Sequence, residues 1–433
     1  YQRAEVLSSI KNIDFVVFSK NFNCLKIIKS VKPDIYFKGP DYKHTKNDLS
    51  KNILKEINLV KKFGGKTEFA NEETFSSTNL ISNFLSFFTK EQQLFINKIK
   101  KKYEFKKVVN YINSLEDLKV ICVGEIIIDK YMFTETIGKS GKEPYLVHRV
   151  KNEEFYSGGS AAIANQIAEF TKKVSLISMI GERKDYLSFI RRKLNNKINF
   201  SFIKKKDSPT IVKERYLETI SKSKVFGTYI INDEEISRFQ ENQLINLIKK
   251  SKKKDSMIVI SDYGHGLITK DIAKYFSKLG KKVYLNTQLN AGNWGRHSLF
   301  KYKNINTLLL NERELRYEMR DDNTNINLIA KKLMRDLKIS NLIITKGSSG
   351  AILVNLKYGK TIIAPALTSN VIDKVGSGDA MLSIISLCLK NKIPHDLALF
   401  FGIIIGSLSV QIIGNKRQIT KLEFLRTIEY LLK

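Results

Sequence analysis

The stretch Asp373-Lys374-Val375-Gly376-Ser377-Gly378-Asp379 carries the strongest chemical signal in this sequence, and the apolar segment Ala380–Leu389 follows it directly. Small residues ahead of a helix let backbone N–H groups approach an anion, and the helix dipole adds positive potential at the same point. A carboxylate one residue further on would repel a phosphate that was only bound there. It suits a general base that removes a proton from a hydroxyl group attacking phosphorus. In isolation, the same pattern also fits a glycine-rich turn whose Asp379 caps the helix.

The sequence around this stretch predicts an α/β fold. From residue 119 onward, short apolar runs alternate with helical patterns, which is typical of a mostly parallel sheet covered by helices. Tyr131–Val150 and Ile211–Ile231 are richer in Thr, Tyr and Val, and we expect them to form extra β-ribbon outside that sheet. The expected buried strands are Lys119–Val123, Val174–Ser178, Met257–Ser261, Val283–Asn286, Thr307–Leu310 and Leu342–Thr345.

The sequence divides into three regions. Residues 1–88 alternate short apolar runs with turns, and we expect strands at Asp14–Phe18 and Asp34–Phe37. Residues 89–118 are polar and lysine-rich with apolar residues at helical spacing, which predicts a helical linker. The larger α/β domain occupies residues 119–433.

The composition excludes several classes of protein. With 42% hydrophobic and 27% charged residues, the 433-residue chain is not a disordered protein. A net charge of +31 raises the question of a nucleic-acid or anionic-membrane partner. The basic residues are dispersed, and arginine, which dominates base readout, is scarce, so we expect no nucleic-acid partner. Cys24, Cys122 and Cys388 fit no disulfide framework or zinc spacing, which indicates a reducing, cytoplasmic compartment.

One segment resembles a membrane span in its composition. Leu397–Gly414 has 18 uncharged residues, with Gly402 and Gly406 in a GxxxG spacing. It also contains Ser and Gln, and its length is near the lower limit for a span. A buried helix in an α/β core explains it equally well, and we expect no membrane partner.

The stretch at 373–379 resembles the ATP-loop signature of the ribokinase-like (PfkB) carbohydrate kinases, whose usual form is Asp-Thr-Val-Gly-Ala-Gly-Asp. The resemblance covers about residues 119–433 and implies a doubly wound, mostly parallel sheet with a small β-lid. Four further motifs resemble those of the family in the same order: Val123-Gly124-Glu125 with Asp129, Ser157-Gly158-Gly159-Ser160, Asn311-Glu312-Arg313-Glu314, and Thr345-Lys346-Gly347 with Gly350.

This resemblance implies a role for each motif. Asp379 would be the general base, and the amides of Gly376, Ser377 and Gly378 would stabilise the developing charge. Asp129, Gly158 and Gly159 would hold the sugar. The resemblance implies ATP and Mg²⁺, with Glu314 acting on Mg²⁺ through water. The residues expected to contact the nucleotide are Asn311, Thr345, Gly347, Gly350 and Ser409.

Some positions narrow the choice of sugar or depart from the family pattern. Ile260–Gly266 resembles a motif of the heptose-phosphate kinases and places Asp262 among the expected substrate-binding residues. His265 stands where that branch usually has lysine, and we assign it no catalytic role. Asn286-Thr287-Gln288 replaces the usual Asp-Pro-Lys, so a different phosphosugar stays open. Lys374 replaces the usual threonine, and Ala162 occupies the place of an asparagine.

Residues 1–88 resemble the second half of the Rossmann-like nucleotidyltransferase (cytidylyltransferase-like) module of ADP-heptose synthesis. The similarity lies in Val31–Asp34, Lys38–Tyr42, Gly64-Gly65 and Ser76–Asn79. Lys38, Ser76, Ser77 and Thr78 would contact phosphates as the remnant of that site. The His-x-Gly-His motif that begins such a module is absent, and residue 1 is tyrosine. We therefore expect the start of this partial domain to lie upstream or to be lost.

These observations predict a bifunctional sugar-nucleotide enzyme whose kinase uses ATP, Mg²⁺ and a heptose phosphate. We expect sugar phosphorylation but no nucleotidyl transfer from this sequence, because the paired histidines are missing. Two alternatives stay open: a kinase of another small sugar or nucleoside, and a non-catalytic sugar-phosphate sensor. Asp379 argues against the sensor, since binding alone does not need a carboxylate beside phosphate. A homodimer is also left open.

Overall fold

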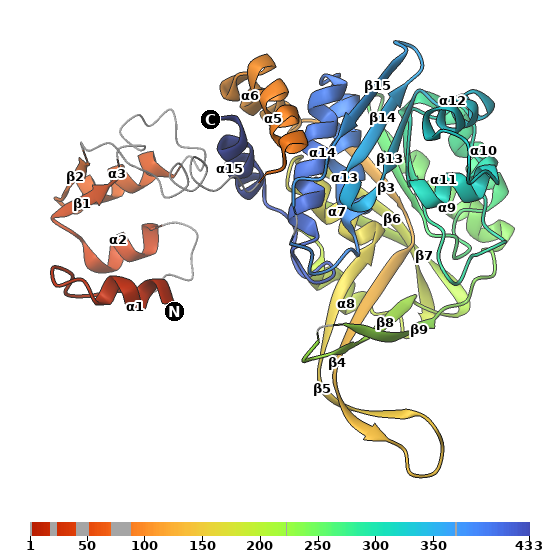
Figure 1. The fold of residues 1–433 in the computed structure, drawn as a ribbon, viewed down its shortest axis with the longest axis horizontal. Coiled ribbons are helices and arrows are strands. Elements are labelled where there is room, and N and C mark those ends of the chain that lie inside the picture. Colours follow the sequence, from red (N-terminus) through yellow and green to blue (C-terminus); the bar gives the residue numbers. More distant parts are fainter. Residues whose placement is uncertain (1, 18–23, 40–51, 71–87, 222, 369) are drawn as a thin grey trace. The chain divides into compact units, whose positions relative to one another are not determined.

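The computed structural model divides into two compact units, Tyr1–Phe87 and Phe88–Lys433. Figure 1 shows their elements in chain order. The structure describes residues 2–17, 24–39, 52–70, 88–221, 223–368 and 370–433.

The first unit is a small α/β arrangement built on one pair of parallel strands. Ile35 of β1 lies opposite Lys66 of β2. The expected strand at Asp34–Phe37 is confirmed within one residue, whereas the one at Asp14–Phe18 is wrong over its described part, 14–17. Phe15 is 88% exposed there, so this apolar run has neither a partner strand nor a core to cover it. The described elements are α1 (Gln2–Ser8), α2 (Leu25–Val31), β1 (Ile35–Lys38), α3 (Ile53–Lys62) and β2 (Lys66–Phe69).

The second unit is built on a nine-stranded sheet with the order β15-β14-β13-β12-β11-β10-β3-β6-β7. The strands from β13 to β7 run parallel, and β14 and β15 add an antiparallel edge. All six strands expected from the apolar runs are present, and β7, β14 and β15 are additional. The strands are β3 (Lys119–Gly124), β6 (Lys173–Arg183), β7 (Ile198–Pro209), β10 (Met257–Asp262), β11 (Val283–Thr287), β12 (Thr307–Asn311), β13 (Asn341–Thr345), β14 (Ala351–Asn355) and β15 (Lys360–Ala364).

Helices cover both faces of this sheet (Figure 1). One face carries α7 (Ser160–Ala168), α13 (Ser377–Lys390) and α14 (His395–Ser409). The other carries α9 (Arg238–Ser251), α10 (Lys270–Leu279), α11 (Glu312–Met319) and α12 (Ile326–Leu337). Side chains fully buried between sheet and helices, such as Leu308, Phe276 and Leu333, form the main core. Short helices complete this unit: α8 (Leu187–Lys193), η3 (Gly280–Lys282), η4 (Leu299–Lys301) and η5 (Gly347–Ser349).

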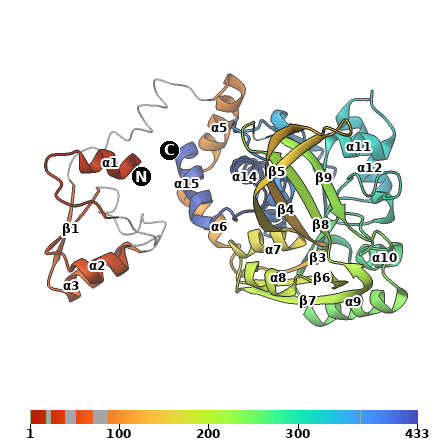
Figure 2. The same cartoon turned by 90° about the horizontal axis from the view of Figure 1, so that it is seen from below.

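A second sheet of four strands, the lid sheet, has the order β5-β4-β8-β9. It comprises β4 (Ile126–Lys139), β5 (Leu146–Gly159), β8 (Val212–Glu218) and β9 (Lys224–Ile230). These strands confirm the extra β-ribbon expected outside the main sheet. β4 and β5 form a long hairpin that extends beyond the nine-stranded sheet, as Figures 1 and 2 show. Since β4 follows β3 almost directly, the lid sheet stands at the carboxyl edge of the main sheet.

The segment predicted as a helical linker forms α5 (Lys90–Lys102) and α6 (Phe105–Asn113). Both helices contact α15 (Lys421–Leu432). Tyr103, at the end of α5, donates a hydrogen bond to Asp396 at 2.7 Å. These two helices are therefore packed into the second unit.

The apolar segment at Leu397–Gly414 forms most of α14, and Leu397–Gly406 is buried inside the second unit. Buried neighbours on α13, such as Ile385 and Met381, contact Gly402 and Gly406. Among the described residues, no helix is long and apolar enough to cross a membrane.

Candidate active site

A cavity of about 720 Å³ lies between the lid sheet, the carboxyl edge of the main sheet and the start of α13. Because β3, β10, β11, β12 and β13 are parallel, the residues that follow them meet at one edge. Eleven of the predicted site residues line this cavity: Asp129, Gly159, Asn311, Glu314, Thr345, Gly347, Gly350, Gly376, Ser377, Gly378 and Asp379.

The start of α13 is shaped to leave backbone N–H groups facing the cavity. Gly376, the N-cap, has a φ of 83°, in the left-handed region that favours glycine. A Cβ atom there would lie 2.6 Å from the Asn415 side-chain oxygen. No side chain of the described residues caps this helix, so its first N–H groups remain available to an anion.

Asp379 is held in the first turn of α13 with one oxygen engaged and one oxygen free. It is 6% exposed, and its Oδ2 accepts a hydrogen bond from the Tyr263 hydroxyl at 2.9 Å. Its Oδ1 is buried and has no partner within the part of the chain that the structure describes. Burial raises the pKa of this carboxyl to about 7. The group therefore has an unused acceptor site and a pKa suited to proton transfer near neutral pH.

Asp129 lies on the lid side of the cavity, and its position explains why Gly158 is a glycine. Its Oδ1 forms an ion pair with Arg215 at 2.5 Å, and its Oδ2 accepts from Asn415 at 3.3 Å. A Cβ on Gly158 would lie 2.1 Å from Asp129 Oδ2. Gly159 has a φ of 61°, and a Cβ there would lie 2.3 Å from the Glu125 carbonyl oxygen and 3.1 Å from the Ile127 backbone nitrogen. The glycines therefore make room for the carboxylate and for strand pairing.

Asp373, at the start of the 373–379 loop, connects that loop to the lid sheet. Its Oδ2 accepts from the Tyr131 hydroxyl at 2.6 Å and from the Gly414 N–H at 3.0 Å. Its Oδ1 accepts from Lys224 at 2.6 Å and from the Val375 N–H at 3.1 Å. Burial acts to raise the pKa of Asp373, but these donors outweigh it and hold the pKa below its ordinary value.

Asn311 and Glu314 form a capping box at the start of α11. The Asn311 side chain accepts from the Glu314 N–H at 2.8 Å, and Glu314 Oε2 accepts from the Asn311 N–H at 2.8 Å. Glu314 Oε1 accepts from the Leu289 N–H at 3.2 Å. Burial raises the pKa of Glu314 to about 7. Because both carboxylate oxygens are bound to the backbone, this residue fits Mg²⁺ through a water better than as a direct ligand.

Three predicted site residues in the second unit do not line the main cavity: Gly158, Asp262 and Ser409. Asp262 is buried, and its Oδ2 contacts Tyr302 and Lys301, each at 2.7 Å. Its Oδ1 accepts from the Gly264 N–H. Ser409 lies beside a separate small pocket and donates its hydroxyl to the Gly406 carbonyl at 2.8 Å.

The predicted remnant of a transferase site lies in the first unit. There Lys38 forms an ion pair with Glu56 at 3.2 Å. Ser76, Ser77 and Thr78 lie outside the described residues.

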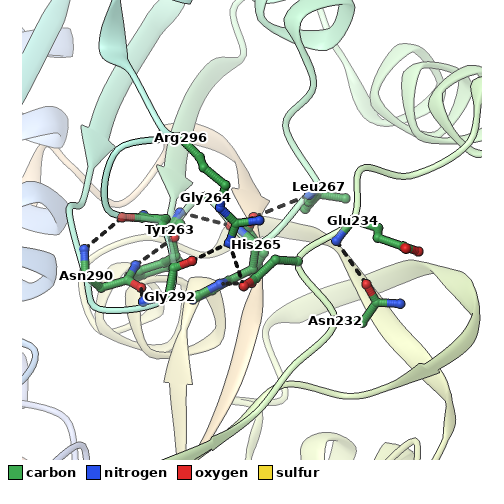
Figure 3. A network of polar contacts seen from close by, with 12 residues as sticks. Asn232, Glu234, Tyr263, Gly264, His265, Leu267, Asn290, Gly292 and Arg296 are labelled. Atoms are coloured by element: carbon green, nitrogen blue, oxygen red, sulfur yellow. Dashed lines mark hydrogen bonds and ion pairs between the residues drawn. The ribbon is translucent and has the colours of Figure 1, made fainter.

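The polar network around His265 holds the loop that carries Tyr263 (Figure 3). His265 Nδ1 lies 2.8 Å from Asp233, whose second oxygen contacts Arg296 at 2.9 Å. Asn290 donates to the Tyr263 carbonyl at 2.8 Å. Burial lowers the pKa of His265 to about 4, and the residue does not line the cavity. Its contacts are those of a residue that positions a loop.

Other cavity residues were not predicted from the sequence. Lys213 and Arg215 are two residues apart on β8, and alternate residues of a strand face the same side. This spacing was the one feature of the sequence that could have indicated a pair of cations on one face of the lid sheet. Further polar and aromatic residues of the lining include Tyr229, Tyr263, Asn286, Gln288, Asn290 and Asn415. They come from separate loops and strands, and no single stretch of sequence joins them.

Known proteins share this architecture. The model of the pfkB family carbohydrate kinases matches residues 117–421. Two curated relatives, both named Bifunctional protein HldE, come from Syntrophotalea carbinolica and Campylobacter jejuni. The first is 25% identical over 325 residues, which is 71% of this chain and 63% of the relative. The second is 26% identical over 286 residues, which is 65% of this chain and 58% of the relative. The matched part spans less than two thirds of either relative.

Solved structures with the same fold include two sugar kinases. Phosphofructokinase-2 from Escherichia coli superposes with a TM-score of 0.59 at 16% identity, over 73% of this chain and all of that one. Ribokinase from Thermotoga maritima gives a TM-score of 0.56 at 17% identity, over 72% of this chain and 99% of that one. At these identities the likeness establishes a ribokinase-like fold.

Proposed function

Because the chain belongs to the pfkB family of carbohydrate kinases, we propose that it phosphorylates a heptose phosphate, with Asp379 as the general base. Kinases of this family use ATP and Mg²⁺. The observation that carries the proposal is the buried, unpartnered Oδ1 of Asp379 beside the uncapped start of α13. A carboxylate there repels bound phosphate, so its presence is best explained by proton transfer.

The proposed chemistry follows from the positions of the site residues. Asp379 Oδ1 accepts the proton of the acceptor hydroxyl, while Tyr263 donates to Oδ2 and fixes the carboxylate plane. The hydroxyl oxygen attacks the γ-phosphorus of ATP, and ADP leaves. The N–H groups of Gly376, Ser377 and Gly378 stabilise the charge on the transferred group. Mg²⁺, when bound with ATP, neutralises phosphate charge, and Glu314 would hold it through a water. The lid sheet limits the access of water to the reacting groups.

The identity of the acceptor sugar defines the experiment. The resemblance of Ile260–Gly266 to heptose-phosphate kinases supports a heptose phosphate, as do the HldE relatives. Asn286 and Gln288 line the cavity and depart from that branch, which keeps another phosphosugar as the alternative acceptor.

The test is a turnover screen of the purified chain with ATP, Mg²⁺ and heptose, hexose and pentose phosphates, with ADP release as the measurement. We expect the highest kcat/KM with a heptose phosphate. A different best acceptor would contradict the proposed sugar alone. ADP release no faster than with ATP alone, for every acceptor, would support the non-catalytic sensor instead.

We also propose that residues 1–88 derive from a nucleotidyltransferase module, so that the enzyme belongs to cytoplasmic sugar-nucleotide synthesis. The parallel pair β1–β2, flanked by α2 and α3, is compatible with part of a Rossmann-like domain. The name of the relatives, Bifunctional protein HldE, supports the same proposal. Pyrophosphate release from ATP or CTP with the kinase product is the measurement. We expect none from this chain, and release would show that the missing histidines are dispensable.

A further inference from the structure

Lys213 is a buried cation on the face of the lid sheet that lines the cavity. It lies in β8 and is 4% exposed. Strand alternation places Arg215 on the same face. In the lid sheet, Lys213 stands opposite Asp129 of β4 and Tyr229 of β9. All four residues line the cavity.

The two cations of β8 differ in their partners. Arg215 is neutralised by its 2.5 Å ion pair with Asp129. The Lys213 ammonium forms no hydrogen bond or ion pair with any residue that the structure describes. It lies over the Tyr229 ring, 4.8 Å from the ring centre, and 6.0 Å from the centre of the Tyr263 ring. A buried charge without a partner is costly, and a bound anion would offset that cost.

Other polar side chains line the same cavity as Lys213, among them Gln288 and Asn290. Asn286, also in the lining, has a buried side-chain oxygen with no partner among the described residues. Tyr263 connects Lys213 to the proposed base, because its ring faces Lys213 and its hydroxyl contacts Asp379. Burial lowers the pKa of Lys213 to about 8, so most of the ammonium stays charged at neutral pH.

We propose that Lys213 binds a phosphate group which the sugar acceptor already carries, and that it thereby selects phosphorylated sugars over neutral ones. This inference rests on the proposed kinase function, since it assigns the acceptor end of the same cavity. Lys213 would act as a point charge, and the neighbouring amides would supply further hydrogen bonds.

The test replaces Lys213 by Met, which keeps the length of the side chain and removes its charge. We expect kcat/KM for the phosphorylated acceptor to fall roughly 100-fold, mainly through a higher KM, because the variant loses a charge-assisted hydrogen bond to the phosphate. For the matching sugar without phosphate, kcat/KM should change less than about threefold. Lys213→Arg should recover part of the loss. Lys130→Met is the control, because Lys130 belongs to the lid sheet and pairs with Glu153 outside the cavity.

Two outcomes would overturn the inference. An equal loss of kcat for phosphorylated and neutral acceptors would place Lys213 at the transferred phosphoryl group. Unchanged kinetics with both acceptors would leave it no role in binding. The thermal midpoint of Lys213→Met should equal or exceed that of the wild type, because no ion pair is lost.

A calorimetric measurement separates this inference from the proposed function. We expect a heptose phosphate to bind the wild-type protein without nucleotide and to bind Lys213→Met about 100-fold more weakly, even if no acceptor is turned over. Equal binding to the two proteins would reject the role of Lys213, whatever the turnover screen shows.

Discussion

The two ends of the cavity are built on different principles. The proposed nucleotide end includes one continuous stretch, 374–379, which lines the cavity and leads into the uncapped start of α13. The proposed acceptor end contains the side chains of Asp129, Lys213 and Arg215, which strand pairing brings together from β4 and β8. A backbone site depends on glycines and is insensitive to most side chains, whereas a side-chain site can be adapted to a new sugar one residue at a time.

Asp373 connects the lid sheet to the loop that precedes α13. It accepts hydrogen bonds from Tyr131 and Lys224 of the lid sheet and from Val375 of the loop. A movement of the lid sheet would therefore shift the loop that leads to Gly376, the N-cap of α13, three residues further along the chain.

Replacing Asp379 by Asn removes the proposed general base, and it should have the largest effect. We expect kcat to fall roughly 10²–10⁴-fold, the usual contribution of a general base, while ATP binding changes little. Steady-state kinetics and ATP titration provide the measurement. Asp271→Asn, on the exposed start of α10, is the control. Turnover like that of the wild type would remove Asp379 from the mechanism.

The same variant tests the pH dependence. Because the folded-state pKa of Asp379 is raised to about 7, wild-type kcat should fall as the pH drops below 7. Stability should change in the opposite direction. The folded protein binds this proton more tightly than the unfolded chain, so stability is lost as pH rises from about 4 to 7. Asp379→Asn should therefore melt at a higher temperature than the wild type at pH 8, but not at pH 4. Parallel melting curves at both pH values would contradict the raised pKa.

Gly376→Ala tests whether the nucleotide end depends on its backbone shape. The new Cβ would lie 2.6 Å from the Asn415 oxygen, at a φ of 83°. We expect kcat/KM for ATP to fall about 100-fold, because a displacement of about 1 Å at the reacting groups has effects of that size. Gly359→Ala is the matched control, since Gly359 also has positive φ but has open space around it. A similar loss of kcat/KM for ATP in both variants would show that backbone strain alone causes the effect.

Lys224→Met tests the connection between the two ends. It leaves the buried carboxylate of Asp373 without its cationic partner, and we expect roughly a 10-fold loss of kcat, smaller than for a fully buried pair because Lys224 is 40% exposed. The change should appear with neutral and phosphorylated acceptors alike, unlike that of Lys213→Met. Lys151→Met, which breaks the half-exposed pair with Glu135, is the control. A purely structural role would lower the thermal midpoint and leave kcat unchanged.

Glu314→Gln should have the smallest effect. Glutamine can keep the capping box, so the start of α11 should persist. We expect the Mg²⁺ concentration for half-maximal activity to rise by at most about 10-fold, with a smaller change in the KM for sugar. Glu312→Gln, which loses the pair with Arg316, is the control. An unchanged Mg²⁺ requirement would leave Glu314 as a helix cap only.

The sequence alone was sufficient for the α/β class, six strands of the main sheet, the lid strands and the stretch at 373–379. These features depend on local residue order: apolar runs, alternation, and glycines next to a carboxylate. It was not sufficient for the strand at Asp14–Phe18, because a strand also needs a partner and a core. The strands β7, β14 and β15, which lie at the two sides of the main sheet, were missed for the related reason that pairing is a property of two segments.

The acceptor end could be found only in the tertiary structure. Asp129 was predicted, but its partner Arg215 comes from a strand 86 residues further along the chain. The spacing of Lys213 from Arg215 in the sequence predicts that the two side chains share a face of the strand, but it does not distinguish Lys213 from the many surface lysines of this chain. Its burial and its missing partner are set by the packing of the lid sheet over the cavity. Backbone conformation follows from neighbours in sequence, whereas the electrostatic environment of a side chain follows from neighbours in space.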